Sequence, residues 1–465
     1  MRKAQKIERK FKTMQYLAKY KSLAIFVPVL KGIEALIAIF IPFIMSRIID
    51  VGIKNNDLSY IWGFSILILG LNFVAIICAL IGQYLAAKTV ENMAKDMRHD
   101  IFVHVNSLSY AELDKFSTAG ILNRTVEDVG QLKNGVGSLL RTTVRIPFLI
   151  VGSLIMAIAI DIRLSAIFLI VSPILVFIVF FVMKRVSPLL MDSKKKLDKT
   201  SGITRENLIG ARVVRAFNKQ DFETSRFQNS NYELVNTDLK IVAWTSVLPA
   251  IIGTVINFAI VAILYFGGFE VNIGNISQGN LIAFINYFTQ ISMALVQIAR
   301  LITIYTRMNT SVDRINEILS LENSIVNPEN PVVVNFDKKT LGDVEFKNVS
   351  FSYNDIHNAI NSLSFKAKHG ETIGVIGGTG SGKSSVMYLI PRFYDATQGE
   401  VLVGGKNVKE YNVEELRKFI GLVPQNPTLF KGTIISNMRW RKPNATEEEI
   451  VKALKISQCY DFVRE

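Results

Sequence analysis

The sequence predicts an α-helical membrane domain followed by an α/β domain, and three observations support this fold class. Hydrophobic residues make up 49% of the 465 residues, which is too apolar for an ordinary soluble enzyme. Six apolar segments are each long enough to cross the roughly 30 Å hydrocarbon core of a bilayer. From residue 344 onward the pattern changes to the polar–apolar alternation of β-strands.

The chain divides into four consecutive parts. The predicted membrane spans lie near residues 22–49, 60–87, 140–160, 163–186, 242–267 and 280–305. We expect the parts to be an N-terminal amphipathic segment, a six-helix membrane domain, a linker and an α/β domain, at residues 1–21, 22–310, 311–341 and 342–465. The two cysteines, Cys78 and Cys459, have neither the number of a disulfide framework nor the spacing of a metal site.

The distribution of basic residues predicts how the chain is oriented. The links after the first, third and fifth spans are short and carry few Lys or Arg, whereas the other two links are long and basic. Because basic loops stay on the cytoplasmic side, we expect a multi-pass cell-membrane protein with both termini, both long links and the α/β domain in the cytoplasm. The net charge of +14 is then explained by the membrane, and no nucleic-acid partner is expected.

Residues 1–21 are strongly basic and are expected to lie along the inner membrane surface before the first span. A disordered basic tail is an equal alternative for the first ten of these residues. The two long links keep helical periodicity, so we expect the spans to continue as cytoplasmic helices that reverse through short helices near residues 110–120 and 207–217. The alternative of purely polar loops is less favoured, because unstructured loops of such length are rare.

A glycine-rich loop in the α/β domain carries the clearest chemical signal. Residues 377–385 fit G-x-x-x-x-G-K-[ST], between a predicted buried strand at 372–376 and a helix that begins near Val386. Such a loop turns its N–H groups around a phosphate, with Lys383 on the β- and γ-phosphates and the Ser384 hydroxyl on Mg²⁺. The alternative is a glycine-rich turn with a chance lysine. The predicted ATP-binding residues of the loop are Gly377, Gly378, Thr379, Gly380, Ser381, Gly382, Lys383, Ser384 and Ser385.

Two further residues of this domain are weaker candidates. Tyr353, at a strand end before the loop, would stack on adenine, although strand tyrosines are more often packing residues. Gln425 follows a short apolar strand at 422–424 and would face the phosphate edge of the sheet, where ligands of open α/β sheets bind. Taken alone, Gln425 is more often an ordinary loop residue.

Together, these motifs behind six spans resemble the ATP-binding-cassette (ABC) exporters of the multidrug type. The resemblance covers essentially the whole chain and is most specific at residues 351–400 and 419–438. It implies that Tyr353 stacks on adenine, that Gln425 contacts Mg²⁺ and the attacking water, and that Lys383 and Gln425 serve catalysis. It also implies that the short reversal helices dock onto ATP-binding domains, and residues 118–124 are similar to the first intracellular segment of that family.

The resemblance implies a half-transporter that works with a second half, as a homodimer or heterodimer. Its activity would be ATP-driven export of hydrophobic or amphipathic drugs, lipids or peptides by alternating access, with ATP and Mg²⁺ as cofactors. One alternative is an ATP-binding regulatory half whose partner hydrolyses ATP, and another is an ATP-gated channel. The signature segment, the catalytic glutamate and the switch histidine of the family are absent before Glu465, so we expect the α/β domain to be incomplete at its C-terminal end.

The spans contain ionisable and polar side chains that are candidates for substrate contacts. Lys31 and Glu34 lie three residues apart in the first span and so share one helix face. They are interpreted either as a site where Glu34 attracts cations or, in preference, as a mutually neutralised pair. Asn286 and Gln290 in the sixth span either line a cavity or bond between helices.

Overall fold

The computed structural model describes residues 15–332, 342–354 and 357–465, which form two compact units. The first unit contains the chain up to Leu108 and Glu112–Glu322; the second contains Ser109–Ala111 and Asn323–Glu465. Most of the basic N-terminal segment, residues 1–14, lies outside the described residues, so its predicted place on the membrane surface stays a prediction.

Six helices of the first unit are long and apolar enough to span a membrane, which confirms the six predicted spans. They occupy Lys21–Ile53, Leu58–Ser107, Thr118–Ile160, Ile162–Ile209, Gln220–Asn272 and Gln278–Leu319. The constituent elements are α2 (Lys21–Arg47), η1 (Ile48–Ile53), α3 (Leu58–Ser107), α5 (Thr118–Asn123), η2 (Arg124–Asp128), α6 (Val129–Ser138), η3 (Leu139–Thr143), α7 (Val144–Ile160), α8 (Ile162–Ile209), α10 (Gln220–Asn272) and α11 (Gln278–Leu319).

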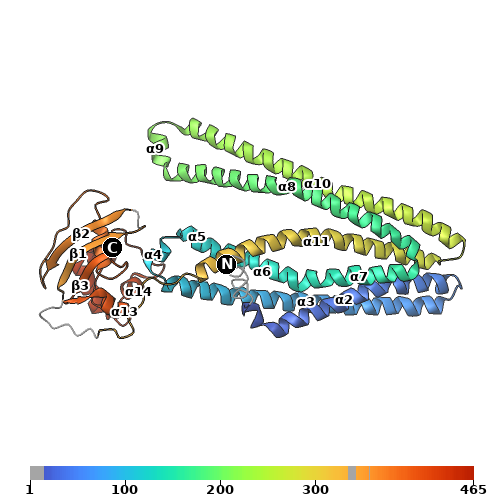
Figure 1. Cartoon of the computed structure of the whole chain (residues 1–465), viewed down its shortest axis with the longest axis horizontal. Coiled ribbons are helices and arrows are strands. Elements are labelled where there is room, and N and C mark those ends of the chain that lie inside the picture. Colours follow the sequence, from blue (N-terminus) through green and yellow to red (C-terminus); the bar gives the residue numbers. More distant parts are fainter. Residues whose placement is uncertain (1–14, 333–341, 355–356) are drawn as a thin grey trace. The chain divides into compact units, whose positions relative to one another are not determined.

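The spans continue as helices well beyond their apolar parts, as the periodicity of the long links predicts. Helices α8 and α10 reach 48 and 53 residues and are joined by the short helix α9 (Ala211–Ala216). Figure 1 shows this pair diverging from the other long helices of the first unit toward α9. The link between α3 and α5 contains the short helix α4 (Tyr110–Leu113), so both predicted reversals contain a short helix.

Close side-chain packing holds the long helices together. One apolar cluster joins α2, α7, α8, α10 and α11 around the fully buried Tyr287, Phe284 and Phe288. Glycines permit this close approach, because a Cβ on Gly152 would lie 2.3 Å from the Ile39 side chain. A second cluster packs α2, α3, α6 and α11 around Met93 and Met97.

The second unit contains a small antiparallel sheet with short helices. The strands, in the order β2-β1-β3-β4, are β1 (Val344–Ser352), β2 (Asn358–Ala367), β3 (Gln398–Val403) and β4 (Lys406–Asn407). The helices are α12 (Lys383–Leu389), η4 (Val408–Glu410), α13 (Val413–Lys418), α14 (Ile434–Met438), α15 (Glu447–Ile456) and α16 (Tyr460–Arg464). Phe346 of β1 is paired in register with Phe365 of β2 and Val401 of β3, and its buried ring belongs to the core that also covers α12.

Two predicted strands of this unit are wrong. Residues 372–376 and 422–424 have no strand pairing, and Ile376 and Val423 are almost fully exposed. A parallel strand becomes buried only when neighbouring strands and helices cover it, and no described segment pairs with either stretch. The apolar residues in these stretches therefore lie at the surface of this unit as extended chain.

Candidate functional site: a glycine-rich loop and a charged cluster between spans

The glycine-rich loop has a backbone that requires glycine. Gly380 and Gly382 adopt positive φ angles of 81° and 86°, which side chains disfavour. At Gly382 a Cβ would lie 2.3 Å from the carbonyl oxygen of Ala359, so a larger residue would displace the loop from β2. Helix α12 begins at the next residue, Lys383. The loop thus packs against β2 and leads directly into α12, so the helix that follows a phosphate-binding loop is present, whereas the segment before the loop, 372–376, is not a strand.

Lys383 folds back over its own loop. Its Nζ donates hydrogen bonds to the carbonyl oxygens of Gly377 at 2.9 Å and Gly378 at 2.7 Å. The ammonium group is therefore held over the centre of the loop, where a phosphate chain would lie. The Ser384 side chain next to it is exposed, which leaves its hydroxyl accessible to a metal ion. Ser385 is buried below the loop.

Tyr353 is brought to the loop by the end of β1. Its hydroxyl lies 3.0 Å from Oγ of Ser385, and its ring packs edge-on against Phe351 and Tyr394. About half of the side chain, 51%, remains exposed. The ring is thus fixed beside the loop while part of its surface stays available for stacking on a base.

Gln425 is exposed, and no hydrogen bond joins it to the glycine-rich loop within the described chain. Its predicted role in Mg²⁺ and water binding therefore stays a prediction. The structure also gives a specific contact to Tyr110, the first residue of the predicted reversal at 110–120. Its ring lies 4.7 Å from that of Phe393 in the second unit, and the Arg417 guanidinium lies over the same Phe393 ring.

The charged pair of the first span is part of a larger cluster. Lys31 Nζ donates to Glu34 Oε2 at 2.6 Å, and the Arg145 guanidinium of α7 lies 3.5 Å from Glu34 Oε1. Arg145 lies inside the third predicted span, but the sequence pattern does not indicate its place beside Glu34, because an ion pair between two helices depends on their packing. The Lys31 and Glu34 side chains are nearly buried, at 10% and 13% exposure.

The polar residues of the sixth span behave differently from one another. Gln290 is part-buried and bonds between helices, since its amide donates to the carbonyl of Ala38 and accepts from Ser153. Asn286 is exposed and donates to the carbonyl of Ile282 in its own helix. Gln290 thus contributes to helix packing, and Asn286 faces away from the apolar core.

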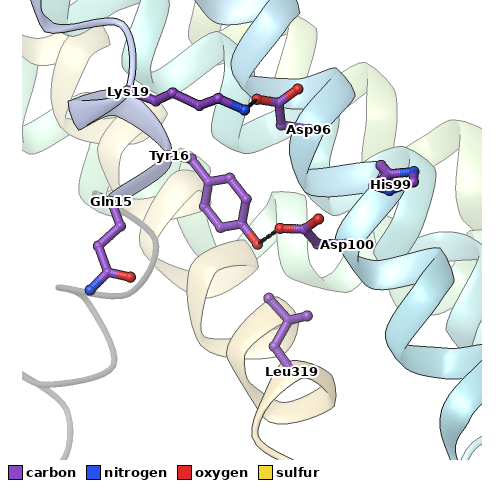
Figure 2. Close-up of a pocket in the computed structure, with 7 residues that line it drawn as sticks. All are labelled: Gln15, Tyr16, Lys19, Asp96, His99, Asp100 and Leu319. Carbon is purple, nitrogen blue, oxygen red and sulfur yellow. Dashed lines mark hydrogen bonds and ion pairs between the residues drawn. The ribbon is translucent and has the colours of Figure 1, made fainter.

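A polar hollow of about 460 Å³ lies where the N-terminal helical turn meets α3 and α11. Figure 2 shows Tyr16 donating to Asp100 and Lys19 paired with Asp96, at 2.8 and 2.7 Å. Tyr20 also donates to Asp96, and this bond raises the pKa of the Tyr20 hydroxyl. These contacts attach the start of the chain to the extension of the second span.

Comparison with known proteins assigns each of the two units to a protein family. The family described as ABC transporter transmembrane region matches residues 24–295, and the family described as ABC transporter matches residues 360–464. The uncharacterized ABC transporter ATP-binding protein YfiB of Bacillus subtilis is 31% identical over 97% of this chain and 78% of its own length. YgaD of the same organism, provisionally named a multidrug export ATP-binding/permease protein, is 29% identical over the same shares.

An ATP-dependent lipid A-core flippase of Methylococcus capsulatus is 26% identical over 92% of this chain and 71% of its own length. These matches cover both the long helices and the glycine-rich loop, whose geometry suits a nucleotide phosphate. The chain therefore belongs to the ABC transporters, as a multi-pass membrane half-transporter of the exporter type that carries an ATP-binding domain and couples ATP hydrolysis to transport.

Proposed function

We propose that this protein exports hydrophobic or amphipathic compounds across the cell membrane by alternating access, as a dimer of half-transporters. The single observation that carries the proposal is the glycine-rich loop, with Lys383 held over it, on the same chain as six membrane-spanning helices. The ATP-binding domain and both termini would face the cytoplasm, where ATP is present, in agreement with the basic long links.

The names of relatives support the substrate class. Multidrug export and lipid A-core flipping both concern molecules with a large apolar part. Aromatic and aliphatic side chains cover the exposed faces of the six helices, which suits contact with lipid and with such substrates. The substrate would move when ATP favours one arrangement of the helices over another, so ATP must bind the two states with different affinity.

Exposed apolar residues at the end of the α8–α10 pair support the proposal that the protein works with a second half-transporter. At the end of the α8–α10 pair, Leu208, Ile209 and Phe217 are 75%, 81% and 72% exposed. They lie outside the predicted spans at 163–186 and 242–267, so lipid is not expected to cover them. A partner surface would bury them, as the docking of short reversal helices onto ATP-binding domains requires.

The loop residues define what this chain contributes to ATP use. On binding, Lys383 would exchange the two carbonyl oxygens that it now contacts for the phosphate oxygens of ATP. The exposed Ser384 hydroxyl and Gln425 would hold Mg²⁺, which neutralises developing charge on the phosphates. Tyr353 would orient the adenine, and Gln425 would position the attacking water.

The test is ATPase stimulation by a panel of amphipathic compounds, measured on the full-length protein in lipid. We expect stimulation by at least one compound class and its loss in the Lys383→Ala variant. If a Lys383→Ala homodimer hydrolyses ATP normally, the assignment of the loop is wrong. If the variant stays active only when it is paired with a different subunit, the protein is instead the regulatory half of a heterodimer.

A further inference from the structure

The charges around Glu34 do not balance. Two cations, Lys31 and Arg145, face one carboxylate, and each of its two oxygens is already used by one of them. Because two positive charges already face this one carboxylate, Glu34 offers no net attraction to a cationic substrate. One positive charge is left over in a part of the protein where unbalanced charge is costly.

Among the described residues, no other carboxylate pairs with Lys31 or Arg145. The acidic residues on the neighbouring helical extensions are paired elsewhere: Glu91 with Lys133, Asp128 with Arg314, and Glu317 with Arg124. Arg145 makes no second ion pair within the described chain, and its Nε has no hydrogen-bond partner there. The guanidinium is thus under-satisfied, although 40% of the Arg145 side chain remains accessible.

A second arginine increases the positive charge next to this position. Arg141 lies four residues before Arg145, on the same side of the continuous η3–α7 helix. Its Nε donates to the carbonyl oxygen of Gly137, and Arg141 has no ion pair in the described residues. The local field therefore favours a negatively charged ligand.

The Lys31 stem packs against α3, since a Cβ on Gly82 would lie in ordinary contact with Lys31 Cε at 3.4 Å. Apolar surface adjoins the charges, since the Phe148 ring lies next to Gly32 and is itself 46% exposed. A cationic group beside apolar surface is the arrangement that an amphiphile with a negatively charged headgroup matches.

We propose that Arg145, supported by Lys31, Glu34 and Arg141, binds the anionic headgroup of an amphipathic substrate, such as a phosphate ester on an alkyl chain. This inference rests on the proposed export function and specifies its substrate class. Arg145 donates to the headgroup oxygens through the guanidinium. Glu34 holds Arg145 in place but lowers the net positive charge, so Glu34 sets the strength of anion binding.

The experiment measures ligand binding to the full-length protein in nanodiscs of zwitterionic lipid, by calorimetry and without ATP. The probes are dodecyl phosphate, dodecyltrimethylammonium and inorganic phosphate. We expect dodecyl phosphate to bind at least about tenfold more tightly than dodecyltrimethylammonium. A tenfold difference in affinity corresponds to the contribution of one charge-assisted hydrogen bond. If inorganic phosphate binds as tightly as dodecyl phosphate, the site binds free anions and the proposal of an amphipathic ligand is overturned. If dodecyltrimethylammonium binds more tightly than dodecyl phosphate, the proposal of an anion site is overturned as well.

Two variants, one that removes a positive charge and one that removes a negative charge, should change anion binding in opposite directions. Arg145→Gln should weaken dodecyl phosphate binding about tenfold, and Glu34→Gln should tighten it severalfold, because one more positive charge is then unbalanced. Arg163→Gln, which removes an exposed arginine in an ion pair on another helix, should leave binding unchanged. If Glu34→Gln binds dodecyl phosphate more weakly than the wild type and has the same unfolding temperature, the proposal is overturned.

Two controls separate this inference from the export function. Lys383→Ala should bind dodecyl phosphate normally while ATP hydrolysis is lost, so ATP-free binding does not depend on the transport cycle. If Glu34→Gln unfolds, the Arg145→Lys variant replaces it: it keeps the charge and should retain most of the preference for phosphate over the cation. The proposal is contradicted if a folded Arg145→Lys protein no longer prefers dodecyl phosphate to the cation while Arg145→Gln binds dodecyl phosphate as the wild type does.

Discussion

The ring of Tyr110 packs against the ring of Phe393, with their centroids 4.7 Å apart, and also contacts Tyr394. Tyr110 belongs to the link between the second and third spans, yet its ring is part of the second unit. The backbone N–H of Ser109, the preceding residue, donates to the side-chain oxygen of Asn323. The link is thus built into the ATP-binding unit at the start of α4.

We expect Tyr110→Ala to lower the amount transported per ATP hydrolysed, because the variant removes the aromatic contact through which the link follows the ATP-binding unit. Aromatic pairs of this kind contribute about 0.5–1.5 kcal/mol beyond the burial of their area. Transport and ATP hydrolysis should be measured in the same proteoliposomes, with Tyr110→Phe as the control that keeps the ring. An unchanged ratio in Tyr110→Ala would show that this contact has no part in coupling.

Tyr353 should contribute to the affinity for ATP only by stacking on the adenine base, and not through the phosphates. Tyr353→Ala is expected to weaken ATP binding about tenfold, since stacking on a base contributes about 1–3 kcal/mol. Binding of tripolyphosphate, which has no base, should not change. Tyr353→Phe loses the hydroxyl contact with Ser385 but keeps the ring, and so should retain most of the ATP affinity. Equal weakening of both ligands in Tyr353→Ala would mean that the residue only supports the loop.

Asp50 connects two spans at the end opposite to α9. Its carboxylate accepts the backbone N–H of Gly279 at 2.8 Å and the hydroxyl of Ser277, where α11 begins. Asp50→Ala should destabilise this junction by about 1–2 kcal/mol, the usual cost of a lost cap. Hydrogen exchange of the first amides of α11 should become faster. Asp57→Ala removes a cap from α3 alone and serves as the control, so equal effects of both variants on α11 would contradict this role.

The N-terminal attachment seen in Figure 2 should resist changes of pH near neutrality. The hydrogen bond with Asp96 raises the pKa of Lys19, and burial followed by the bond to Asp100 raises the pKa of Tyr16. Because these folded-state pKa values are raised, their stabilising contribution is complete below the unfolded pKa values near 10 and is lost only as the pH rises through the folded values. Both groups therefore stay protonated through the neutral range.

Limited proteolysis near residue 20 should accordingly proceed at the same rate at pH 6.5 and pH 8.5 after correction for protease activity. The Asp96→Asn variant should be cut faster at both pH values, because the ion pair with Lys19 is weakened. A rate in the wild type that rises strongly between these pH values would show that another titrating group controls the attachment.

The sequence was sufficient for features that depend on local pattern. The six spans follow from segment length and hydropathy, and the glycine-rich loop follows from its motif. The loop glycines are explained by backbone angles that any chain with this motif must adopt, as at Gly380 and Gly382. Strand β1 likewise begins where polar and apolar residues start to alternate.

Features that depend on tertiary contacts could not be predicted in this way. The stretches 372–376 and 422–424 have the composition of strands, but a strand also needs paired neighbours, which the described chain does not provide. The pairing of Arg145 with Glu34 cannot be read from the sequence, because the two residues lie on different helices. For Gln290 the sequence leaves a cavity-lining role and a bond between helices open, and only the packed helices show the bond to Ala38.

Energy-dependent accumulation of substrate in sealed proteoliposomes is the decisive measurement of ATP-driven export by this protein. Inside-out vesicles that contain the full-length protein are given MgATP on the outside only, together with a fluorescent amphipathic anion. If the protein exports by ATP-driven alternating access, the anion should accumulate inside the vesicles above the passive level, and this accumulation should be lost in Lys383→Ala. Accumulation that needs ATP inside the vesicles, or that persists in Lys383→Ala, would contradict this mechanism.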